Sequence, residues 1–167
     1  MQSLEPPDSH VLSAAEGWFE LGNIVEAKAE LNRISEPRRN HPLVLTVHWM
    51  LSAREKDWPA ALEIAGKLVE LAPEFAFSWL NRAYALRRAP GGGLQAAWDA
   101  LIPALDRFPE EATVFYNLAC YACQMKRPED ARLLLRQALT VGDKTRIKAM
   151  ALKDSDLEPL WPEIHDL

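Results

Sequence analysis

Two cysteines, Cys120 and Cys123, form the one short motif whose residue types could support redox or metal chemistry. A redox Cys-x-x-Cys pair needs a reactive thiolate, which a helix N-terminus favours, and it is typical of chains with a βαβ pattern. Here the pair lies several residues inside a helical pattern without neighbouring strands, and no second pair completes a structural zinc site. We therefore interpret both cysteines as packing or groove-lining residues, because their small side chains suit close helix contacts.

The remaining reactive side chains do not form a recognisable catalytic or metal-binding pattern. The histidines are scattered and lack metal-ligand spacing, and we expect His48 to be a groove or core residue. The glycines at 91–93 could suggest a phosphate cradle, but no Lys-Ser/Thr follows them, so we interpret them as a loose turn. No Ser/His/Asp motif occurs. The sequence predicts a protein that is not an enzyme and that uses no metal and no cofactor.

Composition points to a folded protein without a dominant basic surface. Of 167 residues, 49% are apolar and 26% are charged, which is ordinary for a globular chain. The net charge of −5 comes from residues 1–36, and the rest of the chain is balanced, so we expect no nucleic-acid partner. No apolar run is long enough for a membrane span, and the first ten residues do not resemble a signal peptide. We therefore expect a cytoplasmic location.

The sequence predicts pairs of amphipathic helices, which must position any functional surface. The stretch 112–139 contains two apolar stripes with helical spacing, separated by a polar turn in which Pro128 suits the first turn of a new helix. Similar pairs precede it, and the pattern predicts helices over 9–21, 24–35, 42–55, 58–71, 75–89, 94–107, 112–125 and 128–141. Each pair has an apolar face that it cannot bury alone, so neighbouring pairs must stack.

The helix pairs repeat at a nearly constant period. A small residue opens the apolar stripe of the second helix in each pair, at Ala27, Ala61, Ala97 and Ala131, with spacings of 34, 36 and 34. The fourth pair carries Phe115-x2-Leu118-Ala119 and Ala131-x3-Leu135, which resembles the W-x2-L-G…A-x3-F pattern of the tetratricopeptide repeat. Over most of its length the chain is similar to bacterial-type members of that family.

This resemblance implies an all-α fold, an α-solenoid in which four helical hairpins stack into a right-handed superhelix. We expect a disordered lead over residues 1–7, with Asp8 or Ser9 capping the first helix. The expected repeats span 8–41, 42–74, 75–111 and 112–141 within the domain 8–141. Residues 142–167 are expected to form a C-terminal cap, made of a capping helix and a short terminal helix. The ending LKDSDLEPLW looks like the D-x-D-L-x-P-L ending of many bacterial relatives, and Ser155-x-x-Glu158 fits a capping box.

The resemblance also implies a function, that of a protein- or peptide-binding scaffold whose concave face holds an extended partner segment. Asn81 and Asn117 recur at the position from which many family members bond a peptide backbone, and an amide both donates and accepts. Nearby arginines favour a partner with an acidic side chain or a free carboxylate. The clamp for heat-shock chaperone termini is disfavoured, because Leu12 and Glu16 stand where it needs Lys and Asn. The expected peptide-binding residues are Met50, Asn81, Tyr84, Arg87, Arg88, Tyr116, Asn117 and Gln124.

A second hypothesis stays open. The chain could be a structural or self-assembly module of a larger complex, in which the concave face is not the main site. The sequence alone leaves the oligomeric state and the identity of the partner undetermined.

Overall fold

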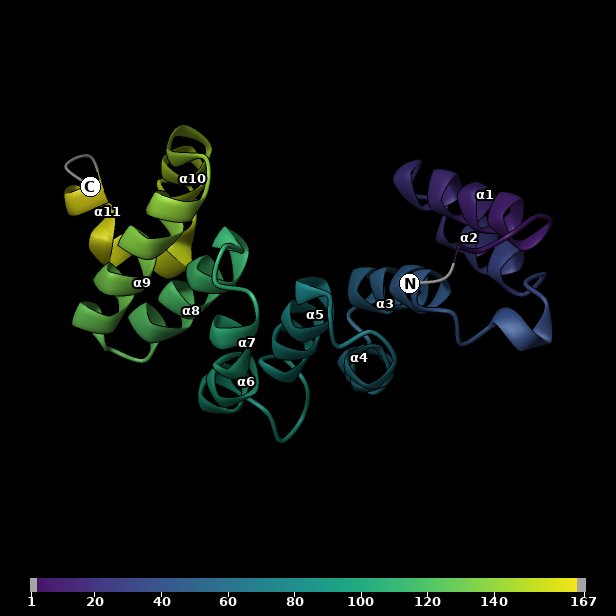
Figure 1. Ribbon diagram of the computed structural model, residues 1–167, viewed down its shortest axis with the longest axis horizontal. Helices are drawn as coiled ribbons and strands as arrows, with labels where there is room; N and C mark the ends of the chain where they lie inside the picture. Colours follow the sequence, from purple (N-terminus) through teal and green to yellow (C-terminus); the bar gives the residue numbers. More distant parts are fainter. Residues whose placement is uncertain (1–2, 165–167) are drawn as a thin grey trace. The chain divides into compact units, whose positions relative to one another are not determined.

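Paired helices joined by short turns make up residues 3–164, the part of the chain that the computed structural model describes (Figure 1). No β-strand occurs among these residues, which confirms the predicted all-α class. The chain divides into two compact units, Met1–Asn81 and Arg82–Leu167. The helices are α1 (Asp8–Glu20), α2 (Ile24–Leu31), η1 (Glu36–Arg38), α3 (Pro42–Glu55), α4 (Trp58–Leu71), α5 (Ala76–Leu86), α6 (Leu94–Leu101), α7 (Pro103–Arg107), α8 (Ala112–Gln124), α9 (Pro128–Val141), α10 (Lys144–Ala151), η2 (Ser155–Leu160) and α11 (Trp161–Ile164).

Three of the hairpins turn in the same way. A residue with positive φ follows the first helix at Gly22 (79°), Lys56 (61°) and Lys126 (63°). In each case the next backbone N–H donates to the carbonyl five residues earlier, as Asn23 N does to Trp18 O at 2.9 Å. This is the hydrogen-bond pattern of a Schellman turn, which satisfies the free carbonyls at a helix end. The shared turn brings the second helix back against the first in all three hairpins.

In the first unit the two hairpins share a core. α1 packs against α2 and α3, and α3 packs against α4. Ala27 and Ala61, which begin the apolar stripes of α2 and α4, are fully buried, as the repeat pattern predicts. The core cluster around the first hairpin consists of Leu4, Leu12, Ala15, Ala27, Leu31, Ile34, Val44, Val47 and Leu51.

The start of the chain differs from the sequence-based expectation. The sequence predicts a disordered lead over residues 1–7, of which 1 and 2 lie outside the described residues, whereas Leu4 is buried in the core cluster of the first hairpin. The N-cap prediction is wrong, because Pro7 takes the N-cap position and makes no side-chain hydrogen bond there. The Asp8 carboxylate instead accepts hydrogen bonds from the backbone N–H and the hydroxyl of Ser35, at 2.8 and 2.6 Å. These bonds lower the pKa of Asp8 and tie the start of α1 to the end of the first repeat.

In the second unit the α8–α9 hairpin lies at the centre. α6 and α7 pack against α8 on one side, and α10 packs against α9 (Figure 1). The predicted helix 94–107 is divided at Ile102 into α6 and α7, because Pro103 has no N–H to continue the hydrogen-bond ladder. The segment η2 packs against α8 and α11. Its Leu157 and Leu160, together with Ile164 of α11, are almost fully buried.

The spacing of 36 between Ala61 and Ala97 is two residues longer than the other two, and the turn between α5 and α6 contains these extra residues. Gly93 N donates to Leu86 O at 3.0 Å, and Gly92 lies so close to the backbone that a Cβ there would be 1.8 Å from Leu86 O. The segment is therefore packed against the end of α5, and only glycine fits at position 92.

No helix in the described part of the chain has the length and apolar character needed to cross a membrane.

Candidate functional site

The candidate site begins with three side chains on one stripe of α8. Tyr116, Cys120 and Gln124 are spaced four residues apart, so they lie above one another on the same helix face. We call this stripe the α8 face. Tyr116 and Cys120 are buried and Gln124 is half-buried. What buries them is the segment Asp154–Leu160 that follows α10.

The two aspartates of this segment are held by the α8 face. Tyr116 donates its hydroxyl to Asp154 Oδ2 at 2.9 Å, and the Cys120 thiol lies 3.5 Å from the same oxygen. Gln124 Nε2 donates to the backbone carbonyl of Asp156 at 2.9 Å. The other oxygen of Asp154 caps η2, since it accepts the N–H of Asp156 at 3.0 Å. Side chains of α8, the first helix of its hairpin, thus hold both a carboxylate and the backbone of an acidic segment.

Arg87, just after α5, completes the arrangement. Its guanidinium forms a two-pronged ion pair with the carboxylate of Asp156, in which Nη2 is 2.9 Å from Oδ1 and Nη1 contacts Oδ2. The guanidinium carbon also lies 5.5 Å from the centre of the Tyr121 ring. The side chains of Arg87 and Asp156 are 19% and 23% exposed, so water screens the pair only in part. The hydrogen bond to Asp156 raises the pKa of Arg87 further above its usual range.

The thiol in this cluster is in its protonated form. Burial, followed by the charge and hydrogen bond of Asp154, raises the pKa of Cys120 far above that of a free thiol. Burial also raises the pKa of Cys123. A reactive redox pair needs the opposite shift, so these cysteines have the environment of packing residues.

Cys120, Asp154 and Asp156 are the described residues that could together hold a metal ion, since their ligand atoms lie within 4.8 Å of one another. Two features of the structure oppose that use. A metal would need the Cys120 thiolate, which the neighbouring carboxylates disfavour, and it would compete with the Arg87 guanidinium for Asp156. The residues therefore fit a hydrogen-bonded cluster better than a metal centre.

The other predicted site residues have different surroundings. The Arg88 guanidinium lies 3.5 Å from the centre of the Tyr84 ring and donates to Tyr84 O at 3.0 Å, which stacks the two side chains. Asn117 Nδ2 donates to Thr113 O at 2.9 Å, within its own helix. In the first unit, Met50 on α3 and Asn81 on α5 are half-buried. Of the eight predicted residues, the structure thus joins Arg87, Tyr116 and Gln124 in one cluster.

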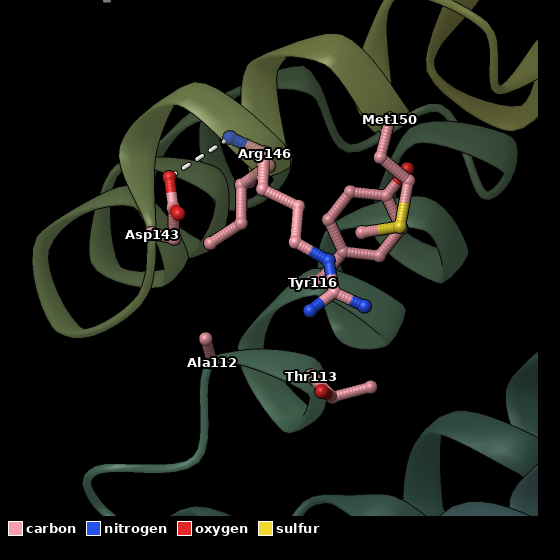
Figure 2. Close-up of a pocket in the computed structure, with 7 residues that line it drawn as sticks. Ala112, Thr113, Tyr116, Asp143, Arg146 and Met150 are labelled. Carbon is pink, nitrogen blue, oxygen red and sulfur yellow. Dashed lines mark hydrogen bonds between the residues drawn. The ribbon is translucent and has the colours of Figure 1, made fainter.

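A pocket of about 320 Å³ adjoins this cluster, between the start of α8 and α10 (Figure 2). Tyr116 belongs to both, since its hydroxyl bonds Asp154 while its ring lines the pocket. The Arg146 side chain extends from α10 toward Tyr116 and Thr113, and Met150 lies beside the Tyr116 ring (Figure 2). The lining residues are Ala112, Thr113, Tyr116, Asp143, Arg146, Ile147 and Met150.

Sequence reasoning missed the acidic half of the cluster. The sequence predicts that the ending LKDSDLEPLW belongs to a C-terminal cap, with Ser155-x-x-Glu158 as a capping box, but Asp154 is the N-cap and its carboxylate accepts the N–H of Asp156. The signal was present in the two aspartates, which have the spacing of the D-x-D-L ending. It also missed Arg146, because α10 lies outside the repeats.

Comparison with known proteins gives a fold. No family model and no curated protein matches the chain in sequence. Among solved structures, the thermophilic TPR protein TTC0263 of Thermus thermophilus is similar with a TM-score of 0.74 and 20% identity, over 94% of this chain and 82% of that one. A double mutant of MamA RS-1 is similar with a TM-score of 0.68 and 16% identity, over 86% of this chain and 79% of that one. MamA 41-end from Desulfovibrio magneticus RS-1 is similar with a TM-score of 0.67 and 18% identity, over 78% of this chain and 73% of that one. The chain therefore has the α-helical repeat fold of tetratricopeptide-repeat proteins.

Proposed function

We propose that this protein is a non-enzymatic, cytoplasmic scaffold that holds an extended, acidic segment of a partner protein. The residues that hold it belong to the first helix of each hairpin, and we call them the first-helix residues. The fold supports the general role, since proteins of this architecture present helix faces to other chains. The single observation that carries the finer proposal is the cluster of Arg87, Tyr116 and Gln124. It holds an acidic segment of the chain itself, through both carboxylates and a backbone carbonyl.

The contacts with this segment define the chemistry that such a face recognises. The Arg87 guanidinium pairs with one carboxylate, the Tyr116 hydroxyl donates to another, and the Gln124 amide donates to the backbone carbonyl of Asp156. In the second unit, Tyr84, Arg88 and Asn117 supply the same three kinds of group. Tyr84 is 38% exposed, and the Arg88 guanidinium stacked on it presents a positive, planar surface. We propose that these three residues contact the partner, and that Met50 and Asn81 do so in the first unit.

One observation favours the alternative, a structural or self-assembly module. Around the turn of the first hairpin, Trp18, Leu21 and Val25 are 37, 78 and 74% exposed. Exposed large apolar side chains that gather on a surface are typical of an interaction site. If this hairpin is the main interface, partners bind there and not at the first-helix residues.

Affinity capture from lysate of the source cells, with variant proteins as bait, separates the two functions. We expect Asn117→Ala combined with Tyr84→Ala to reduce the recovery of the partner at least tenfold, and Arg88→Glu to reduce it further through like-charge repulsion. Gln137→Ala on the exposed side of α9 is the matched control and should retain full recovery. Recovery that is unaffected by the first-helix variants, but is lost in Leu21→Ser combined with Val25→Ser, would favour the alternative function.

A further inference from the structure

We propose that the pocket between α8 and α10 is a binding site for an acidic side chain of the partner segment, together with the apolar side chain next to it. Arg146 would pair with the carboxylate, and Tyr116 and Met150 would contact the apolar group. This inference rests on the proposed function and deepens it, because it specifies two neighbouring residues of the partner.

The charge around the pocket selects an anion. Arg146 is the basic residue among those that line the pocket, and α10, on which it lies, carries no acidic residue. Within residues 3–164, the backbone N–H of Arg146 bonds Asp143 Oδ1 at 3.0 Å, and no side chain pairs with its guanidinium. Figure 2 shows the Asp143 carboxylate directed toward the start of α10 and away from that guanidinium. The guanidinium is thus placed to receive a carboxylate through two parallel hydrogen bonds.

The side chains that line the pocket favour an apolar side chain of the partner next to the carboxylate. Ala112, Ile147, Met150 and the ring of Tyr116 give an apolar lining, and the exposed Thr113 adds a hydroxyl at the rim. The hydroxyl of Tyr116 is already donated to Asp154, so the pocket meets the apolar ring of this residue. Methionine next to an aromatic ring adapts to side chains of different shape. A volume of about 320 Å³ is at the lower end for ligand sites and suits two side chains of a peptide.

A carboxylate fits this pocket better than a doubly charged phosphate does. One guanidinium neutralises a single negative charge, and Asp143 at the rim would repel a second one. The position also suits a segment that continues along α8, because Thr113 and Tyr116 lie in the first two turns of that helix.

The test uses blocked dipeptides and the 167-residue chain. Ac-Leu-Glu-NH2 provides a side-chain carboxylate, Ac-Leu-Gln-NH2 is its neutral match, and Ac-Gln-Leu-OH provides a free terminal carboxylate instead. With methyl-labelled methionine, NMR reports on four methyl groups, and that of Met150 lies in the pocket. We expect Ac-Leu-Glu-NH2 to shift the Met150 signal saturably, with a dissociation constant in the millimolar range for so small a ligand. Both other peptides should bind at least tenfold more weakly.

Two variants locate the interaction. Arg146→Met should reduce the affinity for Ac-Leu-Glu-NH2 to that for Ac-Leu-Gln-NH2. Arg136→Met, which removes an exposed arginine of α9 that does not line the pocket, should leave the affinity unchanged. Equal binding of the Glu and Gln peptides, or no saturable shift of Met150, overturns the proposal. Preference for Ac-Gln-Leu-OH overturns the assignment to a side chain.

The pocket and the scaffold function can fail independently of each other. A captured partner whose recovery is unaffected by Arg146→Met would overturn the pocket assignment and leave the scaffold function standing. Binding of Ac-Leu-Glu-NH2 at Met150 without a partner that depends on the first-helix residues would support the pocket and contradict the proposed scaffold site.

Discussion

Removing the negative charge of Asp156 tests whether polar contacts hold the segment Asp154–Leu160 on α8. Asp156→Asn keeps the size of the side chain but leaves the Arg87 guanidinium, whose side chain is only 19% exposed, without its charged partner. A charge-assisted hydrogen bond contributes about 1.5–3 kcal/mol, whereas breaking a fully buried pair costs about 3–5 kcal/mol. Because this pair is partly exposed, we expect the free energy of unfolding to fall by about 2 kcal/mol.

Urea denaturation followed by tryptophan fluorescence measures this loss, and it is suitable because Trp161 directly follows the segment. The matched control is Glu158→Gln, which removes an exposed carboxylate of the same segment and should change the free energy by less than about 0.5 kcal/mol. A double-mutant cycle with Arg87→Met should give a coupling energy of about 1–3 kcal/mol. If Asp156→Asn behaves like Glu158→Gln, apolar burial alone holds the segment, and the structural precedent for recognising an acidic segment is lost.

Three further predictions concern the fold and its titrating groups. Gly92→Ala should reduce the free energy of unfolding by about 1–3 kcal/mol, because its Cβ would collide with a backbone carbonyl of α5. Gly66→Ala, which adds a Cβ in open space inside α4, should raise the free energy of unfolding by up to about 1 kcal/mol. Equal effects of the two substitutions in urea denaturation would contradict this packing. Iodoacetamide at pH 8 should alkylate Cys120 and Cys123 roughly a hundredfold more slowly in the native protein than in urea, because burial raises the pKa of both thiols; fast native labelling would refute this. Burial lowers the pKa of His48 below its usual value of about 6.5, so the unfolded chain takes up a proton first as the pH falls, and stability should decrease from pH 7 to pH 5; a His48→Gln variant with an unchanged pH slope would refute this origin.

Much of the fold was predictable from the sequence because local patterns of apolar residues and prolines indicate helix pairs. The apolar stripes and the prolines predicted α3, α4 and α9 at the bounds that the structure shows. The small residues of the repeat, such as Ala97 and Ala131, are fully buried because two helix backbones approach each other there. These features depend on neighbours within about one repeat of sequence.

The candidate site was less predictable because it depends on contacts between distant residues. Arg87 and Asp156 are 69 residues apart, and Tyr116 and Asp154 are 38 apart. The resemblance predicted Tyr116 as a peptide-binding residue of the concave face, yet the residue is only 5% exposed, because a segment outside the repeats covers it. Periodicity identifies the face of a helix, but it does not reveal which distant segment packs on that face.

Site-specific photo-cross-linking tests the central claim most directly. A benzoylphenylalanine in place of Tyr84, or in place of Asn117, samples the proposed contact residues of the second unit in cells. The control position is Leu133 on α9, which is 69% exposed. Our account predicts that one partner protein is cross-linked from both first-helix positions, through a peptide that contains an acidic residue, and not from position 133. Cross-links that form at position 133 and are absent from positions 84 and 117 would contradict it.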